Sequence, residues 1–312
     1  MATTDFSVII PVYNEEDNIQ VIYNRLRQAM DQLQLTYELL FINDGSRDNT
    51  LALVKALAVQ HPEVKYIDFS RNFGHQIAVS AGIDHVVGQT ICIIDADLQD
   101  PPELIIDMYR KIQEGYDVVY AKRKKRDGDF PPKIWAAKIF YRLLAKMTSF
   151  PIPVDTGDFR LISRQIVEVL RQMPEKSKYL RGQIAWIGFR QTYVEFDRDA
   201  RLGGKSNYTF LKLLKLALDG ITGFSDIPLK IVTYFGLFVS IFAFCISAYV
   251  LYGRFISNNY VPAGWASTII CVLFIGGIQM VAIGIIGEYI SRMNHDLRNR
   301  PLYIVKESKL KD

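Results

Sequence analysis

Cysteine is scarce in this sequence, with only Cys92, Cys245 and Cys271 among 312 residues. Each lies alone in an apolar segment, without the paired spacing of a disulfide framework or a zinc site. We expect small buried side chains in a reducing compartment. No signal peptide is expected either, because residues 1–5 are short and polar and lead straight into an apolar run. The first domain is therefore predicted to stay in the cytoplasm.

A large excess of one charge is also lacking. The chain has 37 Lys and Arg against 33 Asp and Glu, a net charge of +4. Because a nucleic-acid-binding protein concentrates basic residues on one face, this balance argues against that class. Basic residues gather instead at 122–126, a run typical of a solvated loop, and between 198 and 215.

Charge is nearly absent between residues 229 and 290. Two uncharged runs in this region, 231–252 and 265–287, are long enough to cross a bilayer as helices. Lys and Arg on both flanks predict that both ends face the cytoplasm. We therefore predict a two-helix transmembrane hairpin, with buried core helices as the alternative. No charged residue inside these runs marks a transport path.

The first two hundred residues alternate between short apolar runs and helical periodicity. Strands are expected at 6–11, 37–42, 64–68, 90–94 and 117–121, each of the first four followed by a helix. This alternation indicates βαβ units with right-handed crossovers, so the fold class is predicted to be α/β with a mostly parallel sheet. Further on we expect a strand between Arg160 and a helix at 164–173, a strand at 190–196, and basic amphipathic helices at 135–150 and 208–223. Such helices suit a membrane interface, although packing in a core is the alternative.

Two carboxylates follow the fourth expected strand. Asp95 and Asp97 come directly after the run 90–94, and Gln99 lies two residues further on. Ligands bind at the carboxyl ends of strands in open α/β sheets, and oxygen ligands suit a divalent cation that bridges to phosphate. The alternative is that both acids solvate a turn and cap the helix introduced by Pro101 and Pro102.

Other polar loops are expected at the same edge of the sheet. Asp44, in the loop NDGS, can accept a hydrogen bond from an imide N–H or a ribose hydroxyl, and Gly45 permits close approach of the backbone. An ordinary turn is the alternative for this loop. Arg201 and Lys205, in a glycine-rich basic loop, are candidates to clamp a phosphate group.

Six motifs occur in a fixed order along the chain: VIIPVYNEEDNI, FINDGS, RNFGHQ, DADLQDPPE, DTGDFRL and RLGGKSNY. Together they resemble the glycosyltransferase family 2 enzymes that load a sugar onto a polyprenyl phosphate. The similarity is strongest to GtrB-like glucosyltransferases with a two-helix tail and extends more broadly to dolichyl-phosphate mannose synthases. It covers residues 5–300. A processive polysaccharide synthase is disfavoured, because no QxxRW-like motif is present.

The resemblance implies a GT-A fold and a nucleotide-sugar donor. It assigns uracil and ribose binding to Pro11, Tyr13, Glu15 and Asp44, and it places Arg71 near the nucleotide. Asp95 would help seat the ribose and diphosphate, while Asp97 and Gln99, with Asp95 beside them, would hold Mg²⁺ or Mn²⁺.

The acceptor side is also assigned by resemblance. Arg201 and Lys205 would meet the acceptor or donor phosphate. Asp158, in the motif DTGDFR, would be a base or an orienting group, with capping or pairing to Arg160 as the alternative. His75 would be structural or would contact the donor.

The expected function is inverting, metal-dependent transfer of glucose from UDP-glucose to undecaprenyl or another polyprenyl phosphate at the cytoplasmic (inner) membrane. Alternatives are GDP-mannose or a UDP-linked modified arabinose as donor, and a catalytically silent membrane adaptor. The expected organisation is a cytoplasmic GT-A domain (1–200), an acceptor loop and juxtamembrane helix (201–228), a multi-pass membrane part (229–290) and a cytoplasmic tail (291–312). A homo-oligomer, with a tetramer as one candidate, is expected.

Overall fold

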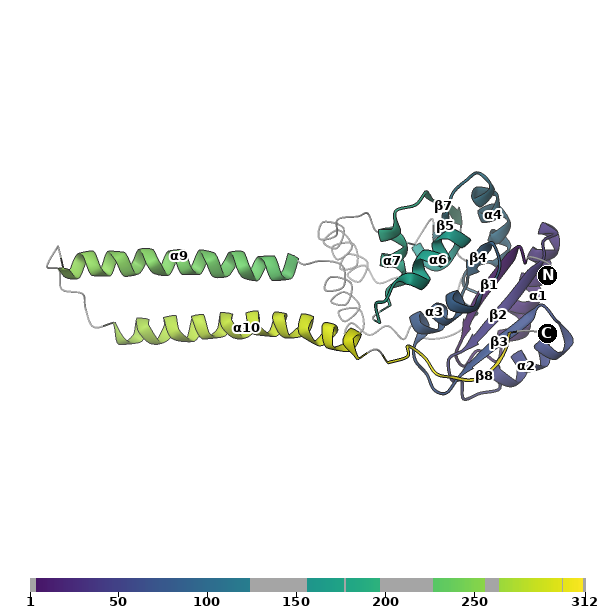
Figure 1. The fold of residues 1–312 in the computed structure, drawn as a ribbon, viewed down its shortest axis with the longest axis horizontal. Coiled ribbons are helices and arrows are strands. Elements are labelled where there is room, and N and C mark those ends of the chain that lie inside the picture. The colour runs from purple at the N-terminus through teal and green to yellow at the C-terminus, as the bar shows by residue number, and fades with distance from the viewer. Residues whose placement is uncertain are drawn as a thin grey trace.

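The computed structural model describes residues 4–123, 156–176, 178–196, 227–255, 264–298 and 300–310. In this part of the chain, strands form one sheet in the order β7-β5-β6-β4-β1-β2-β3-β8. Helices cover both faces of the sheet, and two long helices extend away from it (Figure 1). The predicted amphipathic helices at 135–150 and 208–223 lie outside the described residues.

The centre of the sheet is parallel, as predicted. It consists of β1 (Phe6–Val12), β2 (Tyr37–Asn43), β3 (Val64–Phe69) and β4 (Thr90–Ile93). The crossover helices are α1 (Ile19–Leu33), α2 (Thr50–Gln60) and α3 (His75–His85). Every residue of β1 is buried. An apolar run in the middle of a two-faced parallel sheet has this environment, which is why these strands could be predicted.

The second half of the sheet contains a reversed strand. After the short helix η1 (Pro102–Leu104), α4 (Ile105–Gln113) leads to β5 (Val118–Arg123). The reversed strand is β6 (Thr156–Ser163), which pairs antiparallel with both β4 and β5. It begins within the DTGDFR motif, earlier than predicted. The elements that follow are α6 (Arg164–Gln172), α7 (Leu180–Ile187) and β7 (Gln191–Phe196).

The core lies on both faces of the sheet. One cluster of buried residues joins the sheet to α1, α2 and α4, and a second joins it to α3, α6 and α7. Burial of apolar surface in these two layers holds the sheet edge rigid. The functional loops therefore start from a fixed frame.

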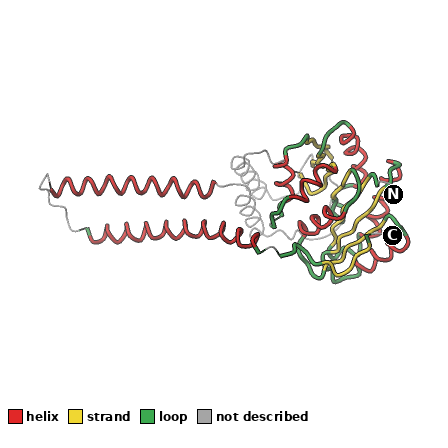
Figure 2. Tube along the Cα trace, viewed as in Figure 1, coloured by secondary structure: helices red, strands yellow, loops and turns green. Residues whose placement is uncertain are grey.

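A hairpin of two helices follows, α9 (Ile227–Phe255) and α10 (Trp265–Leu297), which run side by side (Figure 2). Within the described residues, one stretch is long and apolar enough to cross a membrane, Phe274–Ser291 of α10. The apolar stretch of α9, Val232–Ile246, is shorter. The helical hairpin was thus predicted correctly, but a second membrane span and a multi-pass topology are not supported by these two helices.

The C-terminal segment returns to the sheet. Residues Val305–Lys309 form β8, which pairs antiparallel with β3 at the sheet edge. The sequence prediction treated 291–312 as a tail and missed this strand. Its sequence, VKESK, has no apolar run by which a strand could be predicted. Charged side chains suit an edge strand, since they prevent it from pairing with other chains.

Candidate active site

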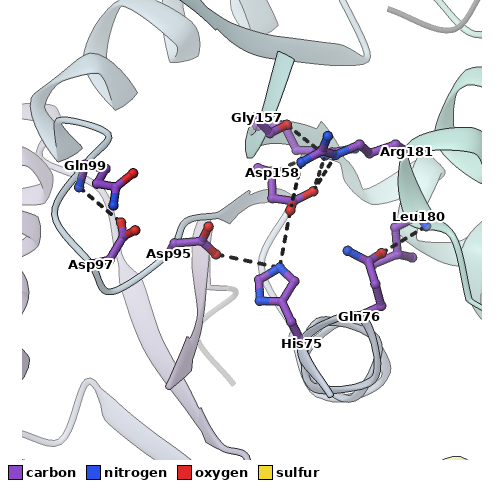
Figure 3. A network of polar contacts seen from close by, with 10 residues as sticks. His75, Gln76, Asp95, Asp97, Gln99, Gly157, Asp158, Leu180 and Arg181 are labelled. Carbon is purple, nitrogen blue, oxygen red and sulfur yellow. Dashed lines mark hydrogen bonds and ion pairs between the residues drawn. The ribbon is translucent and has the colours of Figure 1, made fainter. Parts of the chain in front are cut away.

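The acid pair after β4 lies at the carboxyl edge of the sheet. The side chain of Asp95 is 36% exposed, yet its Oδ1 atom is buried and lacks a hydrogen-bond partner. Asp97 is exposed, and its Oδ1 accepts a hydrogen bond from the backbone N–H of Gln99 at 3.1 Å. In Figure 3, Asp95 lies between this Asp97–Gln99 turn and His75. The three predicted metal ligands therefore belong to one loop.

The antiparallel direction of β6 brings a third carboxylate to this edge. Ile93 of β4 pairs with Arg160 of β6, so Asp158, two residues earlier, lies beyond the carboxyl end of β4. His75, the first residue of α3, bridges the two acids. Its Nε2 lies 3.7 Å from Asp95 Oδ1 and 3.4 Å from Asp158 Oδ2 (Figure 3).

Two arginines bind the other side of Asp158. Asp158 Oδ1 accepts hydrogen bonds from Arg160 Nη2 at 3.0 Å and from Arg181 Nε at 2.9 Å. Asp158 Oδ2 accepts one from Arg181 Nη2 at 3.1 Å. Arg160 is 1% exposed and also donates to the backbone carbonyls of Gly157 and Asp158. Asp158 thus pairs with Arg160, as the sequence allowed, and also with Arg181.

The network sets unusual protonation states. Desolvation of the His75 ring opposes protonation, but the hydrogen bond to Asp158 and the charges of both acids raise its pKa to about 9. Burial opposes ionisation of Asp158, yet Arg181, His75 and Arg160 hold its pKa well below the usual range. Burial raises the pKa of Asp95 to about 6, with the charges of Asp158 and Asp97 adding to this and that of His75 opposing it. His75 is thus a cation and Asp158 an anion at neutral pH.

A divalent cation fits the Asp95 side of this network. By distance, His75, Asp95 and Asp158 could hold a metal, because one ligand atom from each lies within 4.8 Å of the others. Both oxygens of Asp158, however, already accept hydrogen bonds from a guanidinium group. Asp95 Oδ1, by contrast, is a buried oxygen that accepts no hydrogen bond from the described residues, and a hard cation takes such carboxylate oxygens.

A cavity of about 290 Å³ opens at the neighbouring strand ends. Tyr13 and Arg71, two of the predicted donor-binding residues, line it together with Gly45. Gly45 has φ of 68°, and a Cβ atom there would lie 2.6 Å from the carbonyl carbon of Arg71. Only glycine fits this position, because both the conformation and the close backbone approach exclude a side chain.

The remaining predicted donor residues are not in the lining of this cavity. Pro11 is buried in β1. The Glu15 carboxylate accepts a hydrogen bond from Asn18 Nδ2 at 2.6 Å, and burial raises its pKa. Asp44 accepts hydrogen bonds from the backbone N–H groups of Phe73 at 2.6 Å and Gly74 at 2.9 Å. Asp44 therefore fixes the loop between β3 and α3, on which Arg71 and His75 depend for their positions.

Some site residues fell outside the sequence prediction. His75 was given only a weak role on the motif RNFGHQ, and Arg181 had no role at all. The apolar residues of α7 around Arg181 indicate only that this helix packs against the core. They do not identify the partner of Arg181, Asp158, which lies 23 residues away in the chain. Arg201 and Lys205 lie outside the described residues.

Comparison with known proteins places this site in a family. Residues 7–171, more than half of the chain, match glycosyl transferase family 2, and residues 227–293 match the GtrB C-terminal hairpin. The chain is 48% identical to "Uncharacterized glycosyltransferase YkcC" of Bacillus subtilis (strain 168), over 97% of this chain and 94% of that one.

Two further relatives carry a more specific name. The "SfII prophage-derived bactoprenol glucosyl transferase" of Shigella flexneri is 41% identical over 97% of each chain. The "Prophage bactoprenol glucosyl transferase homolog" of Escherichia coli (strain K12) is 42% identical over 97% of this chain and 99% of that one. With its GT-A-like α/β sheet and the acidic loop after β4, this chain belongs to glycosyl transferase family 2 and is a glycosyltransferase.

Proposed function

We propose that this enzyme transfers glucose from UDP-glucose to a polyprenyl phosphate, such as undecaprenyl phosphate, at the cytoplasmic face of the inner membrane. The observation that carries the proposal is the nearly full-length similarity, at 41% identity, to a relative named for glucosyl transfer to bactoprenol. The helical hairpin falls within that match, and it gives the enzyme a means of meeting a lipid acceptor.

The donor is assigned to the sheet edge. Its nucleoside diphosphate would occupy the cavity lined by Tyr13 and Arg71, with the sugar-bearing phosphate on the side of Asp95. Asp95, Asp97 and Gln99 would hold Mg²⁺ or Mn²⁺, which neutralises charge on a leaving diphosphate when bound. The buried Asp95 Oδ1, which accepts no hydrogen bond from the described residues, supports this assignment.

The acceptor supplies its own nucleophile. A phosphate monoester has its second pKa near 6, so the group is largely deprotonated at neutral pH. One of its oxygens forms a bond to the anomeric carbon as the bond from that carbon to UDP breaks, and UDP leaves with the electron pair. Attack from the opposite side inverts the anomeric configuration. No strong general base is required.

Asp158 acts here as an orienting group. Its lowered pKa makes it a weak base, and both of its oxygens are held by Arg181. The carboxylate thereby fixes Arg181 and His75, two cations on the edge where an acceptor phosphate would arrive. Arg201 and Lys205 would add further positive charge to the acceptor phosphate.

The membrane part of the proposal uses both helices of the hairpin. α10 holds the one described stretch of spanning length, but the chain returns to the sheet at β8 after it, so α9 would have to cross the membrane as well, with both ends in the cytoplasm. The protein would then be multi-pass, and residues 201–228 would connect the catalytic domain to the bilayer. We also propose a homo-oligomer, with a tetramer as one candidate.

A sugar-transfer assay tests the function. Membranes containing the enzyme are given undecaprenyl phosphate and radiolabelled UDP-glucose, GDP-mannose or a UDP-linked modified arabinose, and the lipid product is identified by mass. We expect glucosyl lipid from UDP-glucose. Label from another donor would replace the sugar assignment, and no transfer from any donor would favour a silent membrane adaptor.

A further inference from the structure

The nucleotide cavity receives a side chain from the far end of the chain. Lys306, in β8, lines the same cavity as Tyr13 and Arg71. More than two hundred residues, including the helical hairpin, separate Lys306 from these two residues in the sequence. Lys306 is one of the basic residues that follow the hairpin in the sequence, and nothing in the sequence indicates that it lies at the cavity.

An irregularity in the strand pairing accounts for this placement. Asp68 pairs with Glu307 and the next residue, Phe69, pairs with Val305. Lys306 is thus the additional residue of a β-bulge. A bulge re-aims a side chain relative to a regular strand, and bulges are common beside active sites.

The C-terminal segment is fixed on both sides of this bulge. On the N-terminal side, the ring of Tyr303 stacks on Phe69 at 5.1 Å, and the carbonyl of Ile304 accepts a hydrogen bond from Ser70 N at 3.0 Å. On the C-terminal side, Glu307 accepts hydrogen bonds from Lys55 and Tyr66. Lys306 is therefore held at the cavity by its neighbours and not by its own side chain.

The side chain of Lys306 is available to a ligand. Its Nζ lies 3.9 Å from Asp68 Oδ2, a distance longer than a hydrogen bond, and the side chain is 68% exposed. Asp68 already accepts a hydrogen bond from Asn43 Nδ2 at 2.7 Å. Among the described residues, the cavity lining holds the cations Arg47, Arg71 and Lys306 against one acid, Asp68, which favours an anionic occupant.

We propose that Lys306 is a donor-binding residue that contacts the phosphate groups of the nucleoside diphosphate in this cavity. This inference rests on the proposed function for the presence of a nucleotide sugar. It adds a ligand contact from the segment after the hairpin to those from the N-terminal half of the domain. A flexible ammonium group suits this role, because it can follow the diphosphate as a point charge.

Binding measurements on the full-length protein test the proposal without using transferase activity. Calorimetry would measure the affinities of UDP and uridine for the wild type and for Lys306→Ala, Lys306→Arg and Lys309→Ala at low salt. Lys309 lies in the same strand but donates to the carbonyl of Ala58, so Lys309→Ala reports any general loosening of β8. Melting temperatures identify a variant that fails to fold.

We expect Lys306→Ala to weaken UDP binding about fivefold, as for a partly exposed charge pair. Uridine affinity should stay unchanged, Lys306→Arg should bind UDP like the wild type, and so should Lys309→Ala. Unchanged UDP affinity in Lys306→Ala would overturn the proposal, as would an equal loss for uridine or an equal loss in Lys309→Ala. GDP is titrated in parallel. Tighter binding of GDP than of UDP would refute a UDP-sugar as the donor, and the effect of Lys306→Ala on GDP affinity would then test the Lys306 contact.

Discussion

Removing the charge of Asp158 should destabilise the fold, and the structure indicates by how much. In Asp158→Asn, the buried Arg160 would keep its two backbone carbonyl acceptors but lose its anionic partner. Breaking a buried ion pair by removing one partner costs about 3 to 5 kcal/mol, because the remaining charge is uncompensated. Asp158 is 16% exposed, so we take the lower value of about 3 kcal/mol.

The assay is denaturation of the purified protein in detergent, without added divalent metal. A loss of about 3 kcal/mol lowers the melting temperature of a domain of this size by about 6 to 12 °C. Asp107→Asn is the matched control, because it breaks an exposed pair with Arg110 and should leave stability unchanged.

A double variant tests whether the loss of stability comes from the uncompensated charge of Arg160 or only from lost contacts. Asp158→Asn combined with Arg160→Met removes both charges, and well-packed apolar groups can replace a buried pair without loss. The double variant should recover the part of the lost stability that is due to Arg160, while Arg181 and His75 still lack their anionic partner. If Asp158→Asn melts like the wild type, or if the double variant is less stable than the single one, the reasoning is wrong.

Three further predictions concern the same edge. In the folded protein the pKa of His75 is about 9, against an ordinary value of 6.5, so the contribution of His75 to stability is complete below pH 6.5 and is lost as the pH rises to 9. His75→Gln should therefore reduce the change of melting temperature with pH over this range. An unchanged slope would contradict this prediction. Gly45→Ala should lower both stability and UDP affinity more than Gly188→Ala. Gly188 also has a positive φ, but the nearest atom to a new Cβ among the described residues is 3.7 Å away. Melting curves and calorimetry measure the two losses, and equal losses would argue against the close backbone contact at Gly45. Asp97→Ala or metal chelation should reduce sugar transfer to the lipid about 100-fold or more. Readdition of Mg²⁺ or Mn²⁺ should restore transfer only in the chelated wild type. Transfer by Asp97→Ala at the wild-type rate would refute the metal assignment.

Local patterns were enough to predict the parallel half of the sheet. β1 to β4 are apolar runs because both of their faces are covered, and the loops that follow them meet at one edge for reasons of topology alone. The acidic loop of Asp95 and Asp97 was placed correctly for this reason.

The parts that could not be predicted depend on register and long-range pairing. No local feature shows that β6 runs antiparallel to β4, yet this direction brings Asp158 to His75 and Asp95. The charged strand β8 lacks the apolar signal of a strand and exists only because β3 offers an edge. The role of Asp44 in holding a loop follows from two backbone donors that the sequence does not identify.

The return of the chain to β8 changes what a soluble version of this enzyme would need. In chain order the helical hairpin is an insertion within the catalytic domain and not an appendage to it, because residues 305–309 complete the sheet that begins at Phe6. Truncation before the hairpin would remove the stacking of Tyr303, the hydrogen bonds of Glu307 and the contribution of Lys306 to the cavity together. A soluble enzyme should therefore be made by replacing the hairpin with a flexible linker that keeps residues 300–310, and any affinity tag should avoid the C-terminus.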